Sequence, residues 1–108
     1  MLRIVLAEDA ALLREGLVGI LERAGHEVVA AVGDADALLA YTARELPDIV
    51  VTDIRMPPTH TDEGLRAAAR IRAEHPEVAV LVLSAYVAEA YVPELLDSTP
   101  GGGVGYLL

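Results

Sequence analysis

Short runs of apolar, mostly β-branched residues alternate along the chain with longer segments in which apolar residues recur at helical spacing. The short runs are typical of buried strands, and the longer segments are typical of amphipathic helices. Strands are predicted at residues 3–7, 27–32, 49–52, 78–83 and 104–108. Helices are predicted at residues 10–24, 34–45 and 63–74, and a weaker one is expected to begin near Pro93.

Capping and turn residues mark the ends of these segments. Asp9 is predicted to cap the first helix, and Gly25 is predicted to end it. Pro47 precedes the third strand, and Pro76 follows the third helix. Because strands alternate with helices throughout, the sequence predicts a doubly wound α/β domain with a parallel sheet covered on both faces.

The composition fits one domain with a single core, since the chain has 108 residues, of which 54% are hydrophobic. It has no apolar run of about 18 residues and no leader pattern, so we expect a cytoplasmic protein without a membrane partner. The formal net charge of −9, without any lysine, makes this domain a poor DNA-binding surface. The absence of cysteine excludes disulfides and thiolate metal sites.

Acidic side chains follow two of the predicted strands. Glu8 and Asp9 come directly after the first strand, and Asp53 follows the third. The carboxyl ends of parallel strands converge at one edge of the sheet, where open α/β folds place their ligands. Carboxylates gathered there repel one another, and Mg²⁺ would relieve the repulsion because it prefers oxygen donors. The sequence therefore predicts a magnesium site.

This predicted site suits phosphoryl transfer, in which positioning and charge neutralisation do most of the catalysis. Asp53 stands alone at the centre of the sheet edge and is the candidate nucleophile, which would form an acyl phosphate. Two further groups belong to neighbouring strands: Ser84 ends the fourth strand, and Tyr106 lies in the fifth.

The histidines are interpreted as surface residues outside this site. Each is flanked by turn-like sequence and lacks a cysteine or histidine partner at ligand spacing: His26, His60 and His75. No histidine is expected near the strand ends, which argues against zinc or copper.

These signals, in this order, resemble the receiver domain of two-component response regulators. The likeness runs from Met1 to Leu108 and includes the acidic pair, the segment Asp53-Ile54-Arg55-Met56-Pro57, the hydroxyl of Ser84 and the aromatic ring of Tyr106. Three segments are further similar to the LuxR-type subgroup, namely residues 3–9, 13–17 and 105–108. The resemblance implies a flavodoxin-like, five-stranded parallel sheet with strand order 2-1-3-4-5.

The resemblance also implies a role for each acidic residue. Asp53 would accept a phosphoryl group from a phosphohistidine of a sensor histidine kinase. Asp9 and Asp53 would ligate Mg²⁺ directly, Glu8 mostly through water, and Arg55 through its main-chain carbonyl.

Ser84 and Tyr106 would form the switch. Ser84 would hydrogen-bond the phosphoryl oxygens, and Tyr106 would swing inward and reshape the face made by the fourth helix and fifth strand. The domain would catalyse its own phosphorylation and slow dephosphorylation, and would not be an enzyme in the usual sense.

The chain departs from the family's pattern after Tyr106-Leu107-Leu108, where a lysine and a fifth helix would follow. We expect residues 1–108 to be a receiver domain truncated at its C-terminus. In the full transcriptional regulator, a separate helix-turn-helix output domain would contact DNA. If the chain ended here, one bare sheet face would favour a dimer or low stability.

Other functions fit the sequence less well. A flavin-binding flavodoxin-like protein would need a phosphate loop where Glu8 and Asp9 would repel a phosphate. A magnesium-dependent phosphatase or nuclease would need a second carboxylate two residues after the first, which Asp53-Ile54-Arg55 lacks. A receiver-like module that is not phosphorylated, and works by dimerising or binding a partner, remains the alternative. The complete acidic triad argues against this alternative, and the absent lysine argues for it.

Overall fold

The computed structural model describes residues 1–83 and 104–107. Its strands are β1 Arg3–Ala7, β2 Glu27–Val32, β3 Ile49–Asp53, β4 Ala79–Leu83 and β5 Val104–Leu107. Its helices are α1 Ala11–Arg23, α2 Ala35–Glu45 and α3 Glu63–Glu74. The predicted elements in these ranges are confirmed, with ends that differ by one residue at most. The helix expected near Pro93 lies outside the described residues.

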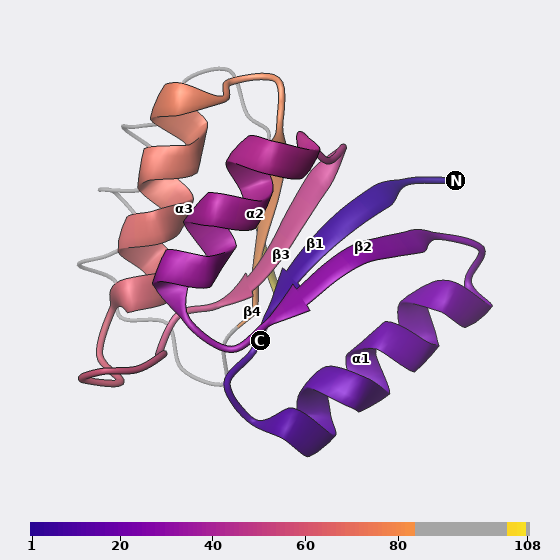
Figure 1. Cartoon of the computed structure of the whole chain (residues 1–108), viewed down its shortest axis with the longest axis horizontal. Coiled ribbons are helices and arrows are strands. Elements are labelled where there is room, and N and C mark those ends of the chain that lie inside the picture. The colour runs from indigo at the N-terminus through magenta and orange to yellow at the C-terminus, as the bar shows by residue number, and fades with distance from the viewer. Residues whose placement is uncertain (84–103, 108) are drawn as a thin grey trace.

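The strands form a single parallel sheet in the order β2-β1-β3-β4-β5, which confirms the predicted topology. Helices α2 and α3 cover one face of this sheet, and α1 lies against the other (Figure 1). The register pairs Ala7 with Thr52 and Asp53 with Leu83. The strands β1, β3 and β4 therefore end at the same edge, as the candidate site requires.

The larger core lies between the sheet and helices α2 and α3. Strand β1 shows how the two faces are divided: Val5 and Ala7 point into this core, and Ile4 and Leu6 point to the face under α1. Buried residues from both helices complete the larger core, namely Leu38, Leu65, Ala67, Ala68 and Ile71.

Helix α1 covers the second face less completely. Its residues Leu17, Val18 and Leu21 pack on the sheet, but no residue of α1 is fully buried. Two other apolar residues of this helix, Leu13 and Ile20, are exposed. Helical spacing identifies apolar positions, but tertiary packing decides which of them the sheet covers.

The ends of α1 correct one prediction and confirm another. Asp9 is not the cap, because Ala10 occupies the N-cap position and makes no side-chain hydrogen bond. At the other end, Gly25 follows the C-cap with φ of 92°, and its N–H donates to the Glu22 carbonyl at 3.0 Å. This left-handed conformation favours glycine.

Helix α2 has the side-chain cap that α1 lacks. The Asp34 carboxylate accepts a hydrogen bond from the Ala37 N–H at 2.7 Å. Helix α3 ends at Glu74, and its C-cap His75 lies directly before Pro76. Across the described ranges, no helix has the length and apolarity needed to cross a bilayer.

Candidate metal centre

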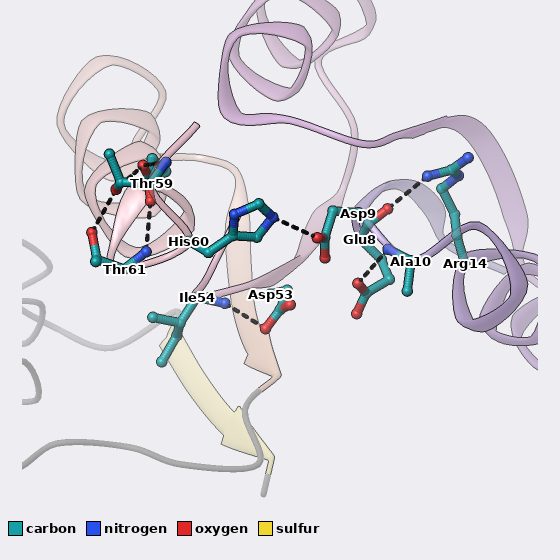
Figure 2. Close-up of polar contacts among 10 residues, drawn as sticks. Glu8, Asp9, Ala10, Arg14, Asp53, Ile54, Thr59, His60 and Thr61 are labelled. Carbon is teal, nitrogen blue, oxygen red and sulfur yellow. Dashed lines mark hydrogen bonds and ion pairs between the residues drawn. The ribbon is translucent and has the colours of Figure 1, made fainter. Parts of the chain in front are cut away.

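The carboxylates predicted to converge do so at the carboxyl edge of the sheet. Because Ala7 pairs with Thr52, the residues that follow them in register, Glu8 and Asp53, are brought side by side. Glu8, Asp9 and Asp53 each offer an oxygen, and these oxygens lie within 4.8 Å of one another. Asp53 thus forms one acidic cluster with Glu8 and Asp9, which lie 44 or more positions earlier in the sequence (Figure 2).

Main-chain groups fix two of these side chains. Glu8 is buried, and its carboxylate accepts a hydrogen bond from the Ala10 N–H at 3.0 Å. The Glu8 carbonyl accepts from the Arg14 guanidinium at 2.8 Å, which ties the start of α1 to the end of β1. The Asp53 carboxylate accepts from the Ile54 N–H at 2.8 Å. The cluster is therefore held in place by the backbone around it.

The electrostatics of the cluster call for a positive charge. Burial raises the pKa of Glu8, opposed by the Ala10 N–H, and its carboxylate neighbours raise it further. Burial also raises the pKa of Asp53, and the charge of Asp9 raises it further. Hydrogen bonds from the N–H groups of Ile54 and Arg55 lower the same pKa but do not cancel the rise. The pKa of Asp9 is lowered, first by a hydrogen bond from Glu8 and then by His60. A divalent cation would relieve this crowding, so the residues fit Mg²⁺.

His60 corrects the expectation that no histidine lies near the strand ends. Its Nε2 atom is 3.0 Å from Oδ2 of Asp9, although its side chain is 54% exposed and is on the surface as predicted. The ring extends from the loop between β3 and α3 toward Asp9 (Figure 2). His26 and His75 are half-buried rather than exposed, and neither is in the acidic cluster.

Glu63 anchors the loop that carries His60, a role that the sequence analysis missed. Its buried carboxylate accepts hydrogen bonds from the Thr59 hydroxyl, from the Thr59 N–H at 2.8 Å and from the Thr61 N–H at 3.0 Å. These bonds, the Thr59 hydroxyl first, lower the pKa of Glu63 to about 2. The available signal was a glutamate at the start of a helix with hydroxyl residues just before it, which resembles a capping box.

Gly64 allows α3 to approach Asp53 closely. Its N–H donates to the Ile54 carbonyl at 2.8 Å. A Cβ atom at this position would lie 1.7 Å from the Asp53 carbonyl oxygen. The start of α3 is thus packed directly on the backbone that carries the candidate nucleophile.

The other predicted site residues are placed less completely. Arg55 is exposed, and its N–H donates to the Asp53 carboxylate. Tyr106 lies on β5 opposite Val82 of β4. Strand β4 lies between β5 and β3, the strand that ends at Asp53. Ser84 lies outside the described residues. The roles of these residues stay predictions.

The fold and the cluster together define a class of protein: a doubly wound parallel α/β domain with an acidic cluster, able to hold a metal ion, at the carboxyl ends of its central strands. Residues 4–107 match the model of the response regulator receiver domain. The chain therefore belongs to the response regulator receiver family, as its resemblance implied.

Individual relatives agree with this assignment. The oxygen regulatory protein NreC of Staphylococcus haemolyticus (strain JCSC1435) is 33% identical over 108 residues, which are 99% of this chain and 48% of that protein. The receiver domain of the response regulator NarL from Mycobacterium tuberculosis is 34% identical, with a TM-score of 0.81 over 98% of this chain and 82% of that one. A LuxR-family two-component response regulator from Aurantimonas sp. SI85-9A1 is 28% identical, with a TM-score of 0.82 over 98% of this chain and 72% of that one. The chain spans about half the length of the curated relatives it matches.

Proposed function

We propose that this chain is the phosphorylatable receiver domain of a two-component transcriptional regulator. Asp53 accepts a phosphoryl group from a phosphohistidine of a sensor histidine kinase in a Mg²⁺-dependent reaction. The observation that carries the proposal is the approach of the Glu8, Asp9 and Asp53 oxygens to within 4.8 Å of one another. In the full regulator, a DNA-binding output domain would read the state of the receiver.

Each group has a task in the proposed reaction. Asp9, Asp53 and the Arg55 carbonyl would hold the cation directly, and the buried Glu8 would hold it mostly through water. The bound ion supplies positive charge that offsets the developing charge on the phosphoryl oxygens. An Asp53 oxygen attacks phosphorus, the phosphorus–nitrogen bond breaks, and its electron pair stays on the donor imidazole.

Phosphorylation changes the output through residues next to the site. Ser84 bonds the phosphoryl oxygens, and Tyr106 turns inward, so that the face formed by β5 and the preceding segment is reshaped. Phosphorylated domains pair with each other, and DNA is contacted through the output domain. We place this reaction in the cytoplasm.

The proposal is tested by incubating the chain with Mg²⁺ and acetyl phosphate and measuring the intact mass. We expect one added phosphoryl group that hydroxylamine releases, as it does from an acyl phosphate. Asp53→Asn should abolish the adduct and chelation of Mg²⁺ should prevent it. Asp36→Asn removes an exposed carboxylate on α2 and should leave the adduct unchanged.

The same experiment distinguishes this proposal from the main alternative. An adduct that survives Asp53→Asn, or no adduct at any Mg²⁺ concentration, would refute the assignment of Asp53. Failure to form any adduct would favour a receiver-like module that is not phosphorylated and acts by dimerising or binding a partner.

A further inference from the structure

The Asp9 carboxylate has a hydrogen-bond partner outside the acidic cluster. The Nε2 atom of His60 lies 3.0 Å from Oδ2 of Asp9, across 51 positions of sequence. The ring points toward Asp9 (Figure 2). A carboxylate has two oxygens, so one oxygen of Asp9 can face a cation while the other stays bonded to His60. The contact is therefore compatible with a bound ion.

The three carboxylates of the cluster are oriented by different kinds of group. Those of Glu8 and Asp53 each accept a hydrogen bond from a nearby main-chain N–H, at 3.0 and 2.8 Å respectively. Asp9 is bonded by the side chains of Glu8 and His60 as well as by its own N–H. A hydrogen bond between two carboxyl groups needs a shared proton, which a bound cation would displace. Of the two side chains, His60 is then the one that continues to orient Asp9.

The backbone that carries this ring is fixed by the fold around it. The His60 N–H donates to the carbonyl of Met56, a fully buried residue, at 2.9 Å. The neighbours on either side, Thr59 and Thr61, are both bonded to the buried Glu63 carboxylate. None of these bonds involves Asp9, so the loop is anchored to α3 independently of the contact between the ring and the cluster. Only the torsions of the His60 side chain must be fixed to make that contact.

We infer that His60 is a positioning residue of the metal site, whose Nε2 atom donates to Asp9 and holds its carboxylate in the orientation that binds Mg²⁺. The ring itself does not ligate the ion. The inference rests on the proposed function, since Asp9 acts there as a metal ligand. Loss of a hydrogen-bond partner of a metal ligand typically weakens metal binding by roughly 10–100-fold. Because the His60 side chain is 54% exposed, we expect an effect at the lower end of this range.

Calorimetry of Mg²⁺ binding to the wild type and two His60 variants tests this role. His60→Gln keeps an amide N–H at about the reach of Nε2, whereas the amide of His60→Asn is one methylene too short. The backbone favours the opposite order, because φ of His60 is 55° and asparagine tolerates this region better than glutamine. A purely structural role would therefore be kept better by asparagine, and a positioning role by glutamine. His75→Asn removes a different imidazole, at the C-cap of α3, as a matched control.

We expect the dissociation constant for Mg²⁺ to rise roughly tenfold in His60→Asn and to change little in His60→Gln and His75→Asn. When Asp53 is labelled with acetyl phosphate, His60→Asn should raise the Mg²⁺ concentration for half-maximal rate more than it lowers the rate at saturating Mg²⁺. An unchanged or lower dissociation constant in His60→Asn overturns the inference. Equal losses of affinity in His60→Asn and His60→Gln also overturn it, because the retained amide N–H would then have no effect.

The proposed function is judged by a separate readout, the Mg²⁺-dependent labelling of Asp53 in the wild type. If Asp53 is labelled and the Mg²⁺ affinity does not depend on His60, the inference fails and the proposed function stands. If the wild type does not bind Mg²⁺, both fail.

Discussion

Replacing Gly64 with alanine tests the close packing of α3 on the backbone of Asp53. The new Cβ would lie 1.7 Å from the Asp53 carbonyl oxygen, 2.8 Å from the Asp53 carbonyl carbon and 3.0 Å from the Ile54 carbonyl oxygen. All three are backbone atoms, so no side-chain rotation can make room. Ordinary contact begins at 3.4 Å, so α3 and β3 must separate by about 1.7 Å, the difference between 3.4 and 1.7 Å.

The magnitude follows from two opposing effects. Overpacking of a well-packed region costs about 1–3 kcal/mol, and a collision with fixed backbone belongs at the upper end. Alanine gains at most about 1 kcal/mol over glycine in a helix, and Gly64 does not have the positive φ that would add strain. The net loss is about 2 kcal/mol, a large part of the roughly 5–15 kcal/mol that stabilises a typical domain.

Urea unfolding followed by circular dichroism measures this loss. With an m-value of about 2 kcal/mol/M, the midpoint should fall by about 1 M in Gly64→Ala. Gly16→Ala is the matched control, because a Cβ at Gly16 meets nothing within 4 Å and α1 should gain about 0.5–1 kcal/mol. If Gly64→Ala unfolds at the same urea concentration as the wild type, the predicted contact between α3 and Asp53 does not exist.

Two further predictions concern single carboxylates. The pKa of Glu63 is lowered from 4.5 to about 2, so its contribution to stability is present above pH 4.5 and is lost as pH falls through about 2. Acid unfolding monitored by circular dichroism should therefore be steeper over that range in the wild type than in Glu63→Gln, and parallel profiles would contradict the Thr59 and Thr61 contacts. Asp34→Ala should lower the free energy of unfolding by about 1 kcal/mol, because it removes the side chain that accepts a hydrogen bond from the Ala37 N–H. Asp34→Asn should retain most of this stabilisation, because asparagine also caps helices. Equal urea midpoints for the two Asp34 variants would show that the cap does not contribute.

The sequence was sufficient for the fold because its local signals agree with one another. The β-branched runs became strands, and the segment predicted as a helix at residues 63–74 is α3 without any change of boundary. The convergence of Glu8, Asp9 and Asp53 could also be predicted, because it follows from parallel strands that end at one edge.

The contacts that the sequence did not reveal are those made by irregular segments. A loop has no periodicity, so nothing in the sequence places His60 beside a residue 51 positions away. The prediction that Asp9 caps α1 was wrong for a related reason. The carboxylate that accepts a hydrogen bond from the Ala10 N–H belongs to Glu8, not to Asp9. Which of two adjacent acids turns toward the helix depends on the site that they share.

Helix α1 buries little of its surface against the sheet, and this has a consequence for the candidate metal centre. This helix has no fully buried residue and rests on Ile4, Leu6 and Val51, whereas the opposite face holds the larger core. Local opening of α1 is accordingly the least costly way to carry Asp9 away from Asp53. A cation held by both carboxylates would oppose this opening by mass action. Amide hydrogen exchange along α1 should therefore be slower when a cation is bound by the carboxylates at the edge of the sheet.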